Sequence, residues 1–224
     1  MAGITREHLS FLEEIKQHND RSWFAKNKTR YEKIHREVKA FFQEIFEELQ
    51  KTDSLSQFHI HRIYRDLRFS KDKTPYKSHF RLHLGRTKPL LRGGYYLNIE
   101  PGNSVASGGF WDPNSKDLLR IRKEFAHDYE AIRAVLNEKH FKKYFGQLRG
   151  TELLTAPKGF DAAHPAIDLL KKKQYIARRF FTDDEVVNAS FLKEIIKTFL
   201  ALRPFFDYMS EVLTTDENGE PLYR

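Results

Sequence analysis

Cysteine is absent from this 224-residue sequence. Its absence excludes disulfides, thiolate zinc sites and a cysteine nucleophile, so any metal site would have to use His, Asp or Glu. Long apolar runs are missing as well. No segment approaches the ~20 uninterrupted apolar residues that a spanning helix needs, and no apolar run follows a basic start at the N-terminus. We therefore expect no membrane partner and a cytoplasmic location.

Acidic residues are scarce in one stretch, residues 62–92. The whole chain has a formal net charge of +8, and this stretch alone has ten basic residues against two acids, Asp66 and Asp72, an excess of eight. The remainder of the chain is balanced, as is usual for a soluble scaffold. The basic residues are Arg62, Arg65, Arg68, Lys71, Lys73, Lys77, Arg81, Arg86, Lys88 and Arg92.

Apolar periodicity in the first fifty residues predicts two helices. Apolar residues recur at helical spacing through residues 9–15, and a longer pattern of the same kind covers residues 23–49. Asn19 and Asp20 separate the two patterns. Either residue is suited to cap the second helix, because a short polar side chain accepts hydrogen bonds from the free N–H groups of a first turn.

The period changes to two from residue 58 onward. Apolar and polar residues alternate through residues 79–84 and 95–100, which predicts strands with one apolar and one polar face. Turn residues at 93–94 and 100–103 favour an antiparallel meander of about four strands over roughly residues 58–110. Asp112 and Pro113 then predict the start of a helix.

Helical patterns dominate the C-terminal part. They predict a helix at residues 118–125, further helix past residue 136, a short helix at 169–170 and a long one at 190–213, with a loop at 150–165 and a strand near 175–182. No repeat or interdomain linker is evident. We predict one α+β domain over residues 1–224, with an antiparallel sheet of about four or more strands and helices packed on one face. Its parts are a helical segment (1–52), a sheet-rich segment (58–110) and a mixed, mostly helical segment (112–214).

The segment between the first two predicted strands, residues 65–79, is too polar for a core. Arginines can direct two N–H donors onto a phosphate or carboxylate, lysines add point charges, and hydroxyl groups add neutral donors. Alternatively, Asp66 and Asp72 simply pair with neighbouring bases and hold the loop in shape. The predicted anion-binding residues are Arg65, Arg68, Ser70, Lys71, Lys73, Thr74, Tyr76 and Lys77.

Acid–base candidates in this segment are Asp66 and His79. An aspartate held among cations stays ionised, and a histidine can titrate near neutral pH, although orienting an arginine suits Asp66 better than acting as a base. Gly108 and Gly109, expected in a loop before a helix, can also let backbone N–H groups approach an anion. No nucleophile elbow, kinase set or metalloprotease helix is present, so enzymatic activity, reaction class and cofactors stay open. The supporting residues are Asp72, Arg81, Tyr96, Gly108, Gly109 and Arg122.

Paired histidines raise the question of a metal. His59 and His61 are two residues apart on a predicted strand, as are His79 and His83, so each pair points toward one face. Such a face could bind zinc or a similar metal. Arg81 lies between the second pair, and a fixed cation repels a metal ion unless carboxylates offset it. We therefore predict no metal site.

Nucleic acid is the main alternative ligand. The basic residues 62–92 and four nearby aromatic residues, Tyr64, Phe69, Tyr76 and Tyr96, could neutralise phosphates and stack on bases. No helix-turn-helix, RNA-recognition or zinc-finger pattern accompanies them. We favour a small phosphate- or carboxylate-bearing ligand, held between the loop and the polar face of the sheet. A structural or protein-interaction role without enzymatic activity is the third hypothesis, and the oligomeric state is not predicted.

The run Arg-Asp-x-Arg-Phe-Ser-Lys-Asp-Lys-Thr-Pro-Tyr-Lys at residues 65–77 resembles the hallmark of a bacterial and fungal family, domain of unknown function 2461. Residues 19–24 resemble its Asn-Asn-x-x-Trp-Phe opening, except that Asp20 replaces the second Asn, which leaves a capping role intact. Residues 94–101, 108–113 with Arg122, and 157–165 resemble later segments. The resemblance covers nearly the whole chain and implies a single α+β domain. It brings no catalytic residue with it.

Overall fold

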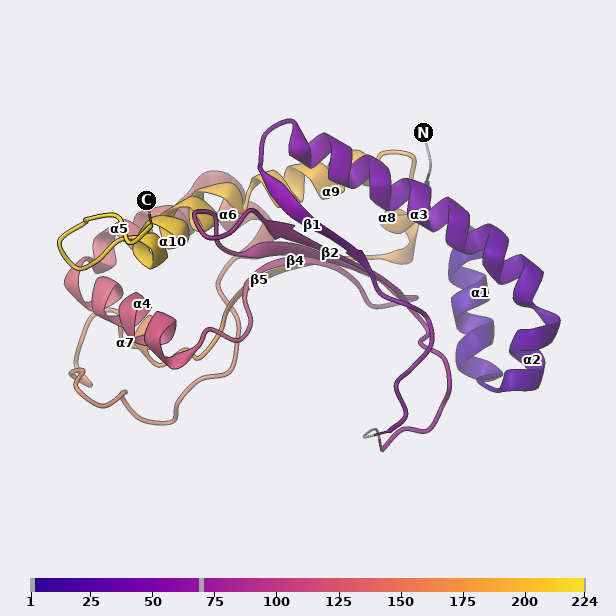
Figure 1. Cartoon of the computed structure of the whole chain (residues 1–224), viewed down its shortest axis with the longest axis horizontal. Helices are drawn as coiled ribbons and strands as arrows, with labels where there is room; N and C mark the ends of the chain where they lie inside the picture. Colours follow the sequence, from indigo (N-terminus) through magenta and orange to yellow (C-terminus); the bar gives the residue numbers. More distant parts are fainter. Residues whose placement is uncertain (1–2, 69–70, 224) are drawn as a thin grey trace. The chain divides into compact units, whose positions relative to one another are not determined.

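A five-stranded antiparallel sheet organises the computed structural model, which describes residues 3–68 and 71–223. The strands follow chain order across the sheet (Figure 1). The α+β class, the antiparallel meander and the later strand near residue 175 are thus confirmed. The strands are β1 (Leu55–Ile60), β2 (Phe80–Arg86), β3 (Gly94–Ile99), β4 (Ser104–Phe110) and β5 (Tyr175–Phe181).

The helices differ from the predicted ones mainly where they break. The second N-terminal pattern is divided at Asn27, and the long C-terminal pattern is divided before Arg203, where Pro204 occupies the first turn of the following helix. No described helix is long and apolar enough to cross a membrane. The helices are α1 (Arg6–Gln17), α2 (Arg21–Lys26), α3 (Lys28–Gln50), α4 (Ser115–His127), α5 (Tyr129–Asn137), α6 (Lys139–Phe145), α7 (Ile167–Leu170), α8 (Asp183–Val186), α9 (Phe191–Leu200) and α10 (Arg203–Thr214).

The cap of α4 also differs from the prediction. The side chain of Asn114, not of Asp112, accepts hydrogen bonds from the backbone N–H groups of Lys116 and Asp117, at 3.0 and 2.9 Å. Asn114 has the extended backbone that a cap requires, and the helix begins one residue later. The helix therefore starts two residues beyond the proline that appeared to open it.

The chain divides into two compact units, which we describe separately. Unit 1 comprises residues 1–84, 96–106 and 180–197, and unit 2 comprises residues 85–95, 107–179 and 198–224. The division falls within β2, β3, β4, β5 and α9. The prediction of one domain over the whole chain stays a prediction.

The core of unit 1 lies between α3 and the apolar face of the sheet. In β2, Phe80, Leu82 and Leu84 are buried, while the alternate residues Arg81 and His83 are only half-buried. The long helix α3 lies along β1 (Figure 1) and buries its apolar stripe. The period of two therefore gives the sheet one face that is covered by helix and one that carries polar side chains.

The core of unit 2 explains two glycines that we had expected in a loop. Gly108 and Gly109 lie in β4 and are buried, so the expected loop is a strand. A Cβ atom on Gly109 would lie 2.1 Å from the carbonyl oxygen of Tyr175, and one on Gly108 would lie 2.4 Å from Cδ1 of Leu202. These glycines allow β4 to approach β5 and the α9–α10 connection closely. Sequence alone cannot distinguish such glycines from those of a turn.

Candidate functional site

A long loop, residues 61–79, connects β1 to β2 and extends from the sheet (Figure 1). We call it the β1–β2 loop. Its two arms pair near the base, where Arg65 N–H donates to the Pro75 carbonyl at 2.9 Å and Lys77 N–H donates to the Ile63 carbonyl at 2.8 Å. The basic side chains of this segment are thus distributed along a hairpin-like loop whose arms are hydrogen-bonded to each other.

Asn19, between α1 and α2, ties this loop to the N-terminal helices. Its amide donates to the carbonyl of Tyr76 and accepts from the N–H of Tyr76, both at 3.0 Å. The Tyr76 ring is buried and stacks on Phe24 with 3.9 Å between ring centroids. The adjacent Asp20 caps α2 by accepting from Ser22 and Trp23 N–H groups. The sequence did not predict this role of Asn19. Its one hint is that Asn19 and Asp20 are both suited to cap α2, although one cap is enough.

Replacing Asn19 by alanine should loosen the loop and cost about 1–3 kcal/mol of stability, because two backbone groups of Tyr76 lose their partner. Asp20→Ala is the matched control, since it removes only a helix cap, worth about 1 kcal/mol. Limited digestion with trypsin after the exposed Lys71 and Lys73 measures loop opening. Cleavage should accelerate in Asn19→Ala more than in Asp20→Ala; equal rates would contradict the tie.

Both carboxylates of the loop pair with arginines. Asp66 binds Arg68 through two bonds, Nε to Oδ1 at 3.0 Å and Nη2 to Oδ2 at 2.6 Å. Asp72 binds Nη1 of Arg65 at 2.5 Å and accepts from the N–H and hydroxyl of Thr74. This arrangement matches the structural alternative, in which the aspartates hold the loop in shape.

The lysines of the loop also hold the backbone. Lys73 donates to the Leu67 carbonyl and Lys77 to the Arg62 carbonyl, both at 2.9 Å. Lys71 is exposed, and Ser70 lies outside the described residues, as does Phe69, one of the expected stacking residues. The predicted clamp residues therefore act largely within the loop itself.

The aspartates are poor bases in this setting. The hydrogen bond from the Arg68 side chain lowers the pKa of Asp66 below its usual value. The pKa of Asp72 is also lowered, first by the N–H of Thr74, then by its hydroxyl, with Arg65 contributing less. A carboxylate with a lowered pKa stays ionised and abstracts protons weakly. The geometry thus suits orientation of the arginines better than catalysis.

A second cluster lies on the polar face of the sheet in unit 1. His61 N–H donates to the carbonyl of Arg81 at 3.0 Å, which places β1 and β2 residues side by side. Arg81 donates from Nε to the Asn98 amide oxygen at 2.7 Å, and its guanidinium lies 5.9 Å from the Tyr96 ring centre. We call this cluster the polar sheet face; its members are His59, His61, Arg81, His83, Tyr96 and Asn98.

Arg81 is linked to an acid only through a neutral amide. Asn98 donates its amide to Glu100 at 3.1 Å, so this carboxylate is linked to Arg81 only through a neutral amide. Within residues 3–68 and 71–223, no ion pair to Arg81 is formed. The guanidinium is therefore oriented by a neutral partner and is not ion-paired.

Mutual repulsion and burial dominate the electrostatics beside the polar sheet face. Burial, and after it Arg81, Lys77 and Arg65, lowers the pKa of His79 to about 3. Its Nε2 atom is buried without a hydrogen-bond partner among the described residues. The expectation that His79 titrates near neutral pH is therefore not met. Burial followed by neighbouring histidines and cations likewise lowers the pKa of His61.

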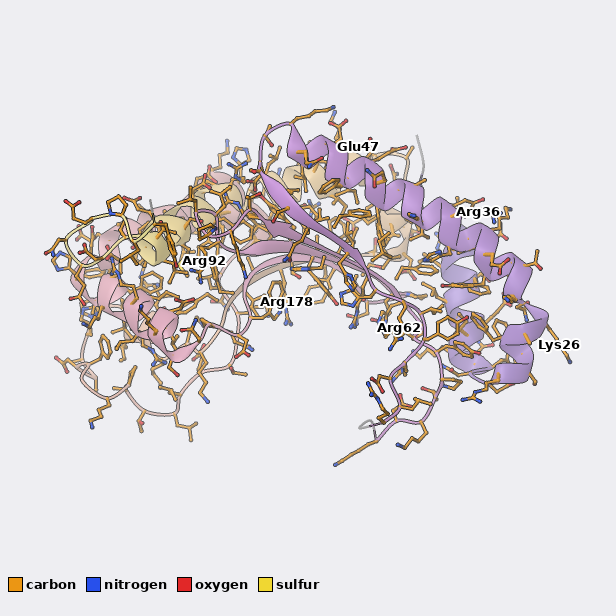
Figure 2. The ribbon with its side chains drawn as sticks, viewed as in Figure 1. Lys26, Arg36, Glu47, Arg62, Arg92 and Arg178 are labelled. Atoms are coloured by element: carbon orange, nitrogen blue, oxygen red, sulfur yellow. The ribbon has the colours of Figure 1, made fainter. Side chains whose placement is uncertain are left out.

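Lys77 is subject to the same two effects. Burial lowers its pKa most, and the positive charges of Arg81, Arg62 and Arg65 lower it further. Figure 2 shows Arg62 at the base of the β1–β2 loop, on the other side of the sheet from Arg36 of α3. The loop base and the polar sheet face thus share one region of positive potential within unit 1.

Metal ligation has little geometric support. Across the described part of the chain, no group of three or more His, Asp or Glu side chains is arranged to hold a metal ion. The rings of His59 and His61 do lie near each other, with centroids 4.6 Å apart, but Arg81 and Lys77 are the charges nearby. Cationic surroundings disfavour a second cation.

One protein family matches most of the chain. The family model described as conserved hypothetical protein (DUF2461) matches residues 7–208. The chain belongs to this family. Searches of curated proteins and of solved structures gave no significant match. Membership confirms the resemblance seen in the sequence, and the family description states no reaction.

In this DUF2461 chain, other predicted site residues have structural roles in unit 2. Arg122 of α4 donates to the Leu170 and Lys172 carbonyls at 2.8 and 3.1 Å, fastening α4 to the end of α7. The fully buried Arg86 side chain pairs with Asp207 at 2.5 Å. The predicted supporting residues Arg122, Gly108 and Gly109, and Arg86 of the basic stretch, belong to unit 2, whereas the β1–β2 loop belongs to unit 1.

Arg92 is neutralised in a similar way by Asp117 of α4. Two of the ten basic residues in residues 62–92 are therefore paired with acids outside that stretch. The stretch itself is divided between units 1 and 2. The charges of Arg86 and Arg92 are consequently offset by these acids.

Proposed function

We propose that the protein binds a small phosphate- or carboxylate-bearing ligand on the polar sheet face of unit 1, with Arg81 at the centre. The observation that carries this proposal is the Arg81 guanidinium, which is held through Nε by the neutral Asn98 amide and forms no ion pair with a described residue. Arg81, Lys77 and Arg65 all depress the pKa of His79, and no carboxylate is among the groups that shift it. Assembling like charges costs free energy, which a bound anion would offset, and such perturbed groups are typical of functional sites.

Individual roles follow from the contacts. The bond from Nε of Arg81 to Asn98 fixes the guanidinium plane, while no described residue accepts from its terminal nitrogens. Those nitrogens can therefore direct two N–H groups onto an anion. Lys77 and Arg62 add point charge, and neutral His79 can exchange a hydrogen bond. We assign no reaction to this site.

Nucleic acid is less well supported than a small anion. Stacking of bases requires accessible aromatic faces, whereas Tyr76 is buried against Phe24. A polyanion also needs a continuous row of cations, whereas Arg86 is fully buried in unit 2. Both observations favour a ligand that needs only a few converging donors.

Arg81→Gln should weaken binding of inorganic phosphate at least about tenfold, as expected for loss of a charge-assisted hydrogen bond. Glutamine retains an amide that can still bind Asn98. Arg36→Gln, an exposed arginine of α3 on the other side of the sheet (Figure 2), is the matched control and should bind as the unmodified protein does. Isothermal titration calorimetry measures both.

Two outcomes would contradict the proposal. Phosphate affinity that is equal in Arg81→Gln and Arg36→Gln would remove Arg81 from the site. Tight binding of a single-stranded oligonucleotide above about 0.2 M salt, with an affinity that falls along log salt at roughly −0.7 per phosphate contacted, would favour nucleic acid instead.

A further inference from the structure

Unit 2 contains a pocket of about 720 Å³. It is lined by the end of α5, by residues 146–152, by α7 and by β5 with the residues before it. Its volume is within the range of roughly 300–1,000 Å³ that small-molecule sites occupy. All its lining residues belong to unit 2, so the pocket shares no residue with the polar sheet face of unit 1.

Two arginines of this pocket share one side of the backbone. Arg149 N–H donates to the Ile176 carbonyl at 2.7 Å, and Ile176 N–H donates back to the Arg149 carbonyl at 2.9 Å. These two reciprocal hydrogen bonds make Arg149 and Ile176 a directly opposed antiparallel pair, with side chains on the same side. Arg178 is two residues beyond Ile176 in β5 and therefore shares that side, diagonal to Arg149.

Gly150 allows this approach. Its φ is +144°, and a Cβ atom there would lie 2.4 Å from the carbonyl oxygen of Gln174. The Gln174 side chain in turn accepts from Thr151 N–H at 3.2 Å. The segment carrying Arg149 is thus held against β5 by backbone contacts. The side chains of Arg149 and Arg178 project from the same side of this paired backbone.

The charges of the pocket are unevenly matched. Arg133 pairs with Asp168 at 2.5 Å, and Lys172 pairs with Glu152 at 2.6 Å. Arg149 and Arg178 are exposed, and neither has an acidic partner among the described residues; Figure 2 shows Arg178 projecting from β5. The pocket therefore has a net excess of two guanidinium groups.

The neutral part of the lining combines side-chain amides with three leucines, Leu136, Leu148 and Leu169, and lacks rings. Side-chain amides come from Asn137, Gln147 and Gln174, and no described residue that lines the pocket is aromatic. Amides donate to and accept from hydroxyl groups, whereas a nucleobase or other flat ring would find no aromatic face to stack on. The lining suits a hydroxylated molecule better than a nucleotide.

We propose that this pocket binds a phosphorylated sugar. The phosphate would lie between Arg149 and Arg178, whose guanidinium groups can each donate two parallel hydrogen bonds to it. The sugar hydroxyls would bind the amides of Asn137, Gln147 and Gln174. This site and its ligand are independent of the anion site proposed in unit 1.

Calorimetry on the full chain tests the proposal with glucose 6-phosphate, glucose, inorganic phosphate and adenosine 5′-monophosphate as probes. Glucose 6-phosphate should bind most tightly. Arg149→Gln and Arg178→Gln should each weaken it at least about tenfold, because each removes a charge-assisted bond. Lys173→Gln, which removes an exposed charge beside the pocket but outside its lining, should leave the affinity unchanged.

Distinct results would overturn the proposal. Measured in the Arg81→Gln background, which weakens the proposed unit 1 site, unchanged affinity in Arg149→Gln and Arg178→Gln would exclude the two arginines. In the same background, equal affinity for inorganic phosphate and glucose 6-phosphate would exclude recognition of hydroxyls. Tighter binding of the nucleotide would exclude the sugar assignment. Arg81→Gln should not alter binding of glucose 6-phosphate, so failure of the unit 1 proposal would be seen separately; loss of binding in that variant would place the ligand in unit 1.

Discussion

Replacing Gly109 by alanine should lower the free energy of unfolding by about 3–5 kcal/mol. The new Cβ would lie 2.1 Å from the Tyr175 carbonyl oxygen and 2.9 Å from Cα of Ile176. Both are backbone atoms of β5, so no side chain can rotate away to make room. The backbone of Gly109 also has φ +146°, which L-residues rarely adopt. Urea unfolding followed by circular dichroism measures the loss.

Gly159→Ala is the matched control within unit 2. Gly159 also has a positive φ, +86°, but a Cβ there would meet no atom within 4 Å. It should therefore cost only the strain of the left-handed backbone, about 1–2 kcal/mol. Equal losses in the two variants would show that β4 and β5 can separate at Gly109 without penalty, contrary to the packing described.

The stability of the protein should fall by roughly 2–4 kcal/mol between about pH 7 and pH 5. In the unfolded chain His79 takes up a proton near its ordinary pKa of 6.5, whereas in the folded protein its pKa is about 3. The unfolded state thus binds more protons between these values, so stability is lost as the pH falls through 6.5. Burial also lowers the pKa values of His8, His35 and His61, which act in the same direction.

His79→Gln should make this pH dependence shallower, by the order of 1 kcal/mol after allowance for solvent screening. His127→Gln, which alters an exposed histidine of α4, should leave the slope as it is. Denaturant titrations at several pH values measure the slopes. An unchanged slope in His79→Gln would show that burial and the neighbouring cations do not lower the pKa of this histidine.

Sulfate links the same titration to the proposed anion site, because it stays doubly charged throughout this pH range. A sulfate ion bound near Arg81 would offset the cations beside His79 and raise the pKa of its imidazole. The loss of stability on acidification should then be smaller in sulfate than in chloride at equal ionic strength. If His79→Gln keeps the full difference between the two salts, the ion binds elsewhere.

Much of the fold followed from periodicity. The alternation in residues 79–84 and 95–100 predicted β2 and β3 with the correct buried faces, because burial on one side of a sheet forces a period of two. Helix breaks were harder to predict. The apolar pattern continues across Asn27, and only the three-dimensional packing of α2 against α3 shows why the chain turns there.

The candidate site was only partly predictable. Charge density identified the β1–β2 loop, but charge does not tell whether a cation meets a ligand or a neighbouring carboxylate, and Arg68 meets Asp66. The approach of Asn19 to Tyr76 and the pairing of Arg86 with Asp207 join residues far apart in sequence. The pocket of unit 2 gave no signal in the sequence, because Arg149 and Arg178 are brought to one side of the backbone only by the pairing of Arg149 with Ile176.

The pairing at the base of the β1–β2 loop would allow the loop's tip, residues 66–74, to be lengthened. Arg65 pairs with Pro75, and the Asn19 amide holds Tyr76, so the ends of the tip are fixed whatever lies between them. Extra residues there would cost chain entropy, about 0.6 kcal/mol for each doubling of length, in addition to any of the bonds from Lys73 to Leu67 and from Arg65 to Asp72 that the insertion breaks. A peptide epitope or a fluorescent label could therefore be inserted into the tip while the sheet and its polar face keep their arrangement.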